Sequence, residues 1–263
     1  MKGLTDTYRS RRGGHPETYP DDTLFAGEGL LETTPHVEDF AVPEYSRYYV
    51  HGPKRYVDIV VSVIALIFFA VLLPLIALAI KIDSRGPIFF LQSRIGVDRR
   101  QRRKSPCATS PERRRVLYPG KPFRIYKLRT MRVDAEASGP QWATENDSRI
   151  TRVGRVLRKT RLDEFPQFMN VLRGEMSVIG PRPERLCFIR QLEHDIPLYH
   201  DRLMVLPGIT GLAQVINGYD TDVNSVRRKV ALDKQYIGNI GWRTDLRILM
   251  ITVRTVLKGD GAL

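Results

Sequence analysis

Residues 59–80, IVVSVIALIFFAVLLPLIALAI, form an apolar run of 22 residues without a charged side chain. A helix of about 20 apolar residues spans the hydrocarbon core of a bilayer, so this run predicts a helix inserted in a membrane. A buried core helix of a soluble domain is the alternative, but the run is too long and too apolar to favour it. Pro74 lies inside the run, where it removes a backbone hydrogen bond and predicts a kink.

Basic residues flank the apolar run on both sides, with Lys54 and Arg55 before it and Lys81 and Arg85 after it. The positive-inside rule therefore does not choose an orientation. Such flanks are expected of a segment that enters the membrane, bends at Pro74 and returns to the same cytoplasmic face. A helix that crosses the membrane once fits the same residues.

The chain of 263 residues has a net charge of +13 and a pI near 10, which implies an anionic partner: nucleic acid, anionic lipid or a phosphorylated substrate. Much of the positive charge lies in a predicted basic loop at residues 98–119. Its arginines are not interleaved with aromatic side chains, which argues against nucleic acid, and the adjacent apolar run favours anionic lipid. Cys107 and Cys187 form no CxxC motif, so neither a zinc site nor a disulfide framework is expected.

Residues 1–52 are rich in proline, glycine, threonine and acids and show no sustained helical or strand period, so we expect a mostly disordered tail. Beyond the apolar run, residues 86–96 and 123–131 contain branched and aromatic residues bounded by glycine and proline. These two segments predict strands or a hairpin.

Three further segments predict helices. Arginines recur at three-residue steps in residues 147–158, opposite an apolar face, which is typical of an amphipathic helix. Residues 184–192 also read as helical. Residues 245–257 are strongly apolar and predict a helix that packs either in the core or in a membrane interface. Between them, residues 206–215 predict a loop punctuated by proline and glycine that could line a pocket.

A stretch with potential chemistry lies at residues 160–183, TRLDEFPQFMNVLRGEMSVIGPRP. Its apolar residues recur at three- and four-residue steps and predict a short helix, with Thr160 as N-cap and Gly174 as its stop. This places Asp163 and Glu164 in the first turn, where the helix dipole favours negative charge. Taken alone, such a pair more often caps a helix than performs catalysis.

The residues that follow favour a chemical role for the pair. Arg182 lies between Pro181 and Pro183, whose fixed φ angles suit a rigid guanidinium clamp for phosphate. An aspartate with a depressed pKa is a good nucleophile toward phosphorus, and a neighbouring glutamate can hold a hard divalent cation together with substrate phosphates.

The order of these segments points to a family. A basic-Tyr-Val-Asp sequence precedes the proline-interrupted apolar run, and it is followed by GPIFFLQSRIG, FRIYKLRTM, RITRVGRVLRKTRLDEFPQ, SVIGPRP and PGITGLAQV. In this order the chain resembles the bacterial sugar transferases, the monotopic phosphoglycosyl transferases that begin polysaccharide and glycoconjugate assembly. The resemblance covers residues 54–263.

The resemblance implies transfer of a sugar-1-phosphate from a UDP-sugar to a polyprenyl phosphate, such as undecaprenyl phosphate, with release of UMP. It implies that Asp163 is the nucleophile, which forms a covalent phosphosugar intermediate, and that Glu164 is the ligand of Mg²⁺. Phosphate-binding roles are implied for residues of the matching motifs: Lys127, Arg129, Arg158, Pro181, Arg182 and Pro183.

The resemblance also implies an α+β, mostly helical fold. A re-entrant membrane helix-break-helix, broken at Pro74, would pack on a small catalytic domain with interfacial amphipathic helices and a short β-hairpin. The expected parts are a disordered tail, 1–52, a re-entrant membrane helix, 53–85, and a catalytic domain, 86–263. The catalytic domain would lie on the cytoplasmic face of the bacterial inner membrane, with a nucleotide sugar and a lipid phosphate as partners and no nucleic acid.

Some residues depart from the family pattern. The basic loop at 98–119 is longer than usual, and Leu206 and Leu212 stand where many members have a basic residue and a tryptophan. The donor sugar is therefore not specified. A membrane-anchored basic scaffold without catalysis is the alternative function. It accounts for the apolar run and the charge, but not for an Asp-Glu pair followed by Pro-Arg-Pro.

Overall fold

The computed structural model describes residues 46–98, 119–137, 139, 147–196, 199–217 and 223–258. All of them belong to the unit that spans Pro35–Leu263. The predicted tail up to residue 45 and most of the predicted basic loop lie outside the described residues. Residues 47–51, which were expected in the tail, form a short helix instead.

The described chain is mostly helical and contains two small sheets, which agrees with the predicted α+β class. In chain order the elements are α1 (Arg47–His51), α2 (Pro53–Asp83), β1 (Phe89–Ile95), β2 (Pro122–Leu128), α3 (Arg152–Lys159), the 3-10 helix η5 (Leu162–Gln167), α4 (Phe168–Leu172), β3 (Ser177–Ile179), α5 (Leu186–Leu192), the 3-10 helix η6 (Tyr199–Met204), β4 (Gly208–Thr210), α6 (Leu212–Ile216), α7 (Val223–Gly238) and α8 (Trp242–Lys258).

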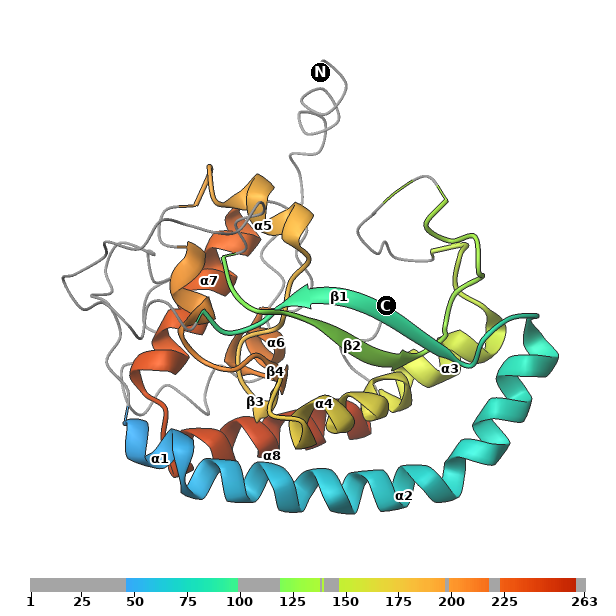
Figure 1. Cartoon of the computed structure of the whole chain (residues 1–263), viewed down its shortest axis with the longest axis horizontal. Coiled ribbons are helices and arrows are strands. Elements are labelled where there is room, and N and C mark those ends of the chain that lie inside the picture. The colour runs from blue at the N-terminus through green and yellow to red at the C-terminus, as the bar shows by residue number, and fades with distance from the viewer. Residues whose placement is uncertain are drawn as a thin grey trace. The chain divides into compact units, whose positions relative to one another are not determined.

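Helix α2 is continuous from Pro53 to Asp83, with Pro74 inside it. Figure 1 shows that its C-terminal part bends away from the line of its first part. An internal proline removes one backbone hydrogen bond, which can bend a helix without ending it. The expected break is therefore a bend in a continuous helix. Among the described residues, the stretch Arg47–Asp83 is the one helix long and apolar enough to cross a membrane.

The inner side of α2 packs against the rest of the unit. Phe69 and Ile80 form an apolar core with Leu128 of β2 and Leu157 of α3. Phe165 of η5 stacks on Phe69, with ring centroids 6.0 Å apart. The middle of the apolar helix is thus in direct contact with the element that carries the Asp-Glu pair.

Both ends of α2 are hydrogen-bonded to the same unit. Near the N-terminal end, the Arg55 guanidinium donates to the carbonyl oxygens of Val171 and Leu172, at 2.6 and 3.0 Å, and so satisfies the free carbonyls at the end of α4. At the C-terminal end, Arg129 donates to the carbonyl oxygen of Ser84 at 2.7 Å. Both ends of the apolar helix are therefore hydrogen-bonded to the same polar unit.

The predicted strands are confirmed as the antiparallel pair β1 and β2, in which Phe89 lies opposite Leu128 and Ile95 opposite Pro122. Figure 1 shows them as a long two-stranded ribbon. Phe123, Ile125 and Leu128 of β2 are buried. This packing fixes the strand that carries Lys127.

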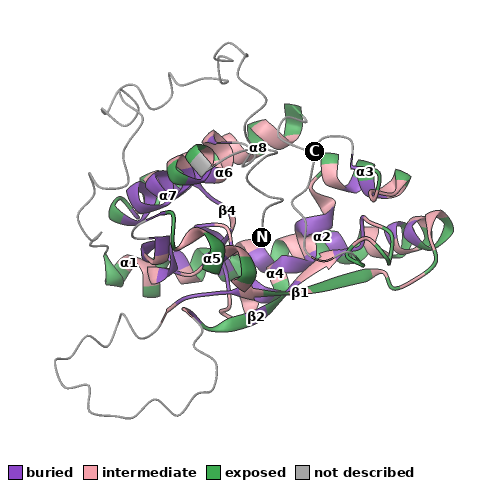
Figure 2. Ribbon diagram, turned by 90° about the horizontal axis from the view of Figure 1, so that it is seen from above, coloured by how far each residue is buried: buried purple, intermediate pink, exposed green. Residues whose placement is uncertain are grey.

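A second core is formed around α7. Val226 and Val230 of α7 pack with Ile95, Ile189 and Tyr199, and Figure 2 shows that α7 is largely buried. The short strands β3 and β4 pair in parallel, and both contact α8. The residues expected as a loop at 206–215 therefore contain a strand and a helix, β4 and α6.

The predicted helix at 245–257 is confirmed as part of α8. Its two sides differ, because Ile248 is fully buried whereas Leu246, Met250 and Val253 are about half exposed. The helix thus has one side in the core and one exposed apolar side, and its placement in a membrane interface stays a prediction.

Candidate active site

Asp163 and Glu164 lie in the 3-10 helix η5. Thr160 is the C-cap of α3 rather than the N-cap of a new helix, and its hydroxyl donates back to a carbonyl oxygen of α3. Arg161 follows with φ +57°, in the left-handed region, and precedes η5. The prediction of Thr160 as an N-cap is therefore wrong, because the left-handed Arg161 separates α3 from η5. Gly174, with φ +71°, stops the following helix as predicted.

Two cations meet on one oxygen of Glu164. Lys127 Nζ from β2 and Arg182 Nη2 from the segment after β3 each lie 3.0 Å from Glu164 Oε1. Only 10% of the Glu164 side chain is exposed. The structure thus brings together three residues that lie far apart in the sequence and were predicted to share a site.

The two carboxyl groups have opposite electrostatic environments. Burial and the neighbouring charge of Glu164 raise the pKa of Asp163 to about 6. Burial acts in the same direction on Glu164, but Lys127 and Arg182 outweigh it and hold the pKa of Glu164 well below its usual range. The two cations thus favour the charged form of Glu164, whereas burial disfavours the charged form of Asp163. The lowered pKa expected for the aspartate is found at Glu164 instead.

Arg158 and Arg129 differ in what they reach. Arg158 Nε donates to the hydroxyl of Thr130 at 3.1 Å, and its charge lowers the pKa of Asp163 against the larger effect of burial. The guanidinium of Arg129 donates to the carbonyl oxygens of Arg85 and Ser84, at 2.9 and 2.7 Å. In this structure Arg129 caps the end of α2 rather than facing the carboxylates.

The three prolines singled out in the sequence lie in two parts of the structure, the carboxylate site and the apolar helix. Pro181 and Pro183 are buried on either side of Arg182, beside Glu164. Pro74 lies within α2. The first two can restrict the backbone of the site, whereas Pro74 shapes the apolar helix.

Two residues near the site were not assigned from the sequence. Arg161 acts electrostatically on both carboxyl groups, lowering the pKa of each. Asn170 is fully buried and joins α4 to β2, because its side chain accepts from the Tyr126 N–H and donates to the Arg124 carbonyl. The position of Arg161 directly before the Asp-Glu pair was the available signal, whereas a lone asparagine gives none.

Asp163 and Glu164 are candidate ligands for Mg²⁺. This ion prefers oxygen ligands and is held by one or two carboxylates together with water and substrate phosphates. Asp163 and Glu164 are adjacent, buried and of the right chemical type. Among the described residues there is no cluster of three or more metal-binding side chains. The donor set fits an ion shared with substrate, and does not fit a fully protein-enclosed metal site.

The chain matches the model of a known protein family. The family model described as bacterial sugar transferase matches residues 49–259. This match begins within α1 and extends through α8, and it includes both the apolar helix and the carboxylate site. The chain belongs to the bacterial sugar transferase family.

Curated relatives agree with this assignment. The chain is 44% identical over 209 residues to UDP-N-acetylgalactosamine-undecaprenyl-phosphate N-acetylgalactosaminephosphotransferase of Aeromonas hydrophila, a match that covers 80% of this chain and 44% of the relative. It is 39% identical over 211 residues to UDP-glucose:undecaprenyl-phosphate glucose-1-phosphate transferase of Caulobacter vibrioides, covering 80% of this chain and 71% of the relative. It is 38% identical to the exopolysaccharide production protein PSS of Rhizobium leguminosarum, covering 79% of this chain and 97% of the relative. The chain thus spans less than half of the Aeromonas protein.

The raised pKa of Asp163 predicts a stability effect. The pKa rises from 3.8 to about 6 on folding, so ionisation of Asp163 lowers the free energy of unfolding as pH rises through this window. Asp163→Asn removes this cost, and the metal-free variant should be more stable than the wild type by up to about 3 kcal/mol at pH 8. Thermal melting in EDTA at pH 8 and pH 4 checks this, because the difference should nearly vanish at pH 4. A variant less stable than the wild type at pH 8 would contradict it.

Proposed function

We propose that this chain is a phosphoglycosyl transferase that moves a sugar-1-phosphate from a UDP-sugar to a polyprenyl phosphate, undecaprenyl phosphate in particular. This reaction would initiate exopolysaccharide or glycoconjugate synthesis. The observation that carries the proposal is the buried Asp163 beside Glu164, with Lys127 and Arg182 3.0 Å from the latter. Family membership and the names of the relatives support the choice of substrates.

In the first step, an ionised oxygen of Asp163 attacks the phosphorus that bears the sugar. A bond forms between this oxygen and phosphorus, the bond to the bridging oxygen of UMP breaks, and UMP leaves with the electron pair. In the second step, an oxygen of the lipid phosphate attacks the same phosphorus and displaces Asp163. The product is a lipid diphosphate sugar, and the carboxylate is regenerated.

Cations are needed because both substrates are anionic and must approach an anionic side chain. Lys127 and Arg182 would bind the donor's phosphate oxygens, and their position 3.0 Å from Glu164 supports this role. Arg158 and Arg161 add positive charge beside Asp163 and favour its ionised form. Mg²⁺, held by Glu164 and phosphate oxygens, would neutralise further charge on the donor.

The same proposal places α2 as a re-entrant helix on the cytoplasmic face of the bacterial inner membrane. The supporting observation is that Arg55 and Arg129 bond opposite ends of α2 to one polar unit. A straight crossing would put these ends in different compartments. The bend of the helix, with Pro74 inside it, is consistent with entry and return.

The test is UMP release by the full chain in detergent, with Mg²⁺, undecaprenyl phosphate and a panel of UDP-sugars. UDP-N-acetylgalactosamine and UDP-glucose belong in the panel because relatives are named for these donors. We expect release with at least one donor, dependent on Mg²⁺ and lipid phosphate for repeated turnover. Lack of release with every UDP-sugar would contradict the proposal.

A further inference from the structure

Groups outside the carboxylate site donate hydrogen bonds to the backbone carbonyls of residues 181–183. Arg202 of η6 donates through Nη2 to the Arg182 carbonyl oxygen at 3.1 Å. Arg94 of β1 donates through Nη1 to the Pro183 carbonyl oxygen, also at 3.1 Å. The Gly208 N–H donates to the Pro181 carbonyl oxygen at 2.9 Å. Three successive carbonyls are therefore fixed by three different elements.

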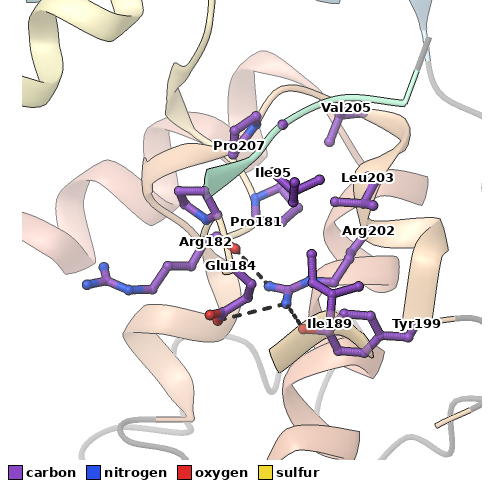
Figure 3. A pocket seen from close by; sticks show the side chains of 12 residues that line it. Ile95, Pro181, Arg182, Glu184, Ile189, Tyr199, Arg202, Leu203, Val205 and Pro207 are labelled. Carbon is purple, nitrogen blue, oxygen red and sulfur yellow. Dashed lines mark hydrogen bonds and ion pairs between the residues drawn. The ribbon is translucent and has the colours of Figure 1, made fainter. Parts of the chain in front are cut away.

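The side chain of Arg182 points away from this support. Figure 3 shows Arg202 on one side of the segment and the Arg182 guanidinium on the other. Arg182 reaches Glu164 from there, at 3.0 Å. Arg202 and the Arg182 guanidinium thus lie on opposite sides of this segment, and Arg202 contacts Arg182 through the backbone carbonyl.

The supporting arginines are themselves held in place. The Arg202 side chain is only 2% exposed, and it donates to the Tyr199 hydroxyl at 2.8 Å and pairs with Asp233 of α7 at 2.7 Å. Glu184 binds Lys229 at 2.7 Å and Arg94 at 3.4 Å. Buried charges are costly unless they are paired, and these ion pairs restrict the guanidinium groups of Arg202 and Arg94. Among the described residues, Arg202 Nε and Arg94 Nε have no hydrogen-bond partner.

These hydrogen bonds restrict the backbone of residues 181–183 more than the two prolines do alone. Pro181 and Pro183 fix their own φ angles, and Pro183 also disfavours the α region for Arg182. The extended region that remains is broad, so the prolines alone do not fix the orientation of each peptide plane. Hydrogen bonds to the successive carbonyls fix those planes. The direction of the Arg182 side chain is set in consequence, and a misplacement of about 1 Å in such a group can cost about a hundredfold in rate.

We propose that Arg202 and Arg94 are positioning residues, which orient the backbone of residues 181–183 so that the Arg182 guanidinium meets the donor's phosphate. The inference rests on the proposed function. It assigns no contact with substrate to Arg202 or Arg94. It requires that their effect on the reaction pass through Arg182.

A double-mutant cycle tests this requirement. Arg202→Lys keeps the charge beside Asp233 but cannot reproduce the planar guanidinium that bonds Tyr199, Asp233 and the Arg182 carbonyl together. We expect it to raise KM for the best UDP-sugar by about tenfold, with a smaller change in kcat. In an Arg182→Ala background, Arg202→Lys should have almost no further effect.

Controls make the result decisive. Arg190→Lys, at an exposed position of α5, should leave KM and kcat unchanged. Melting curves identify a variant that fails to fold; if Arg202→Lys does so, the same cycle with Arg94→Lys and Arg182→Ala replaces it. Effects that multiply in the double variant would overturn the inference while leaving the proposed function in place. A wild type that releases no UMP from any donor would overturn the proposed function, and this inference with it.

Discussion

Asp163→Asn should lower the rate of UMP release by at least about a thousandfold, because asparagine has the shape of aspartate but no anionic oxygen to attack phosphorus. The wild type should in addition release about one UMP per active site when lipid phosphate is absent, since the first step does not need the acceptor. Intact-protein mass spectrometry of that sample should show the mass of one sugar phosphate added to the chain. Neither the UMP burst nor the added mass should appear with Asp163→Asn.

Asp195→Asn serves as the matched control, because Asp195 is an exposed aspartate outside the site. It should retain wild-type rates. Asp163→Asn should still bind membranes, since α2 does not depend on this carboxylate. Full activity of Asp163→Asn would exclude Asp163 as nucleophile. Membrane binding without any turnover in the wild type would instead favour the non-catalytic scaffold.

The elements that the sequence predicted well are those whose residues signal locally. The strands at 86–96 and 123–131 have branched and aromatic residues between turn formers, and β1 and β2 lie there. The apolar run lies within α2, and its proline marks a helix that bends. In each case one stretch of chain contains the whole signal.

Helix α7 was not predicted from the sequence because its stability depends on contacts with residues far away in the chain. Helix α7 was missed because its buried residues include Lys229 and Lys234, which obscure the apolar period. Their charges are paired by Glu184 and Asp201, which lie outside α7. A lysine in a sequence predicts a solvated position unless its partner is already known.

The same limit applies inside the KLRT sequence of the site. Lys127 and Arg129 are both basic and two residues apart, so the sequence alone does not show that their contacts differ. The structure directs Lys127 to Glu164 and Arg129 to the end of α2. The packing of α2 and η5 determines which group each side chain contacts. No local sequence pattern predicts this packing.

Glu164→Gln should reduce turnover by about a hundredfold or more and weaken the response to Mg²⁺, because the amide offers a neutral oxygen where the carboxylate could hold the ion. The change also leaves Lys127 and Arg182 without the anion on which both converge, so their alignment toward phosphate is weakened. UMP release measured against Mg²⁺ concentration checks both effects: the half-maximal concentration should rise, and saturating Mg²⁺ should restore only part of the rate. Glu175→Gln is the matched control, since Glu175 bonds Asn170 rather than either cation. An unchanged Mg²⁺ dependence in Glu164→Gln would exclude Glu164 as the metal ligand, and the remaining loss of rate would then measure its role in holding the two cations.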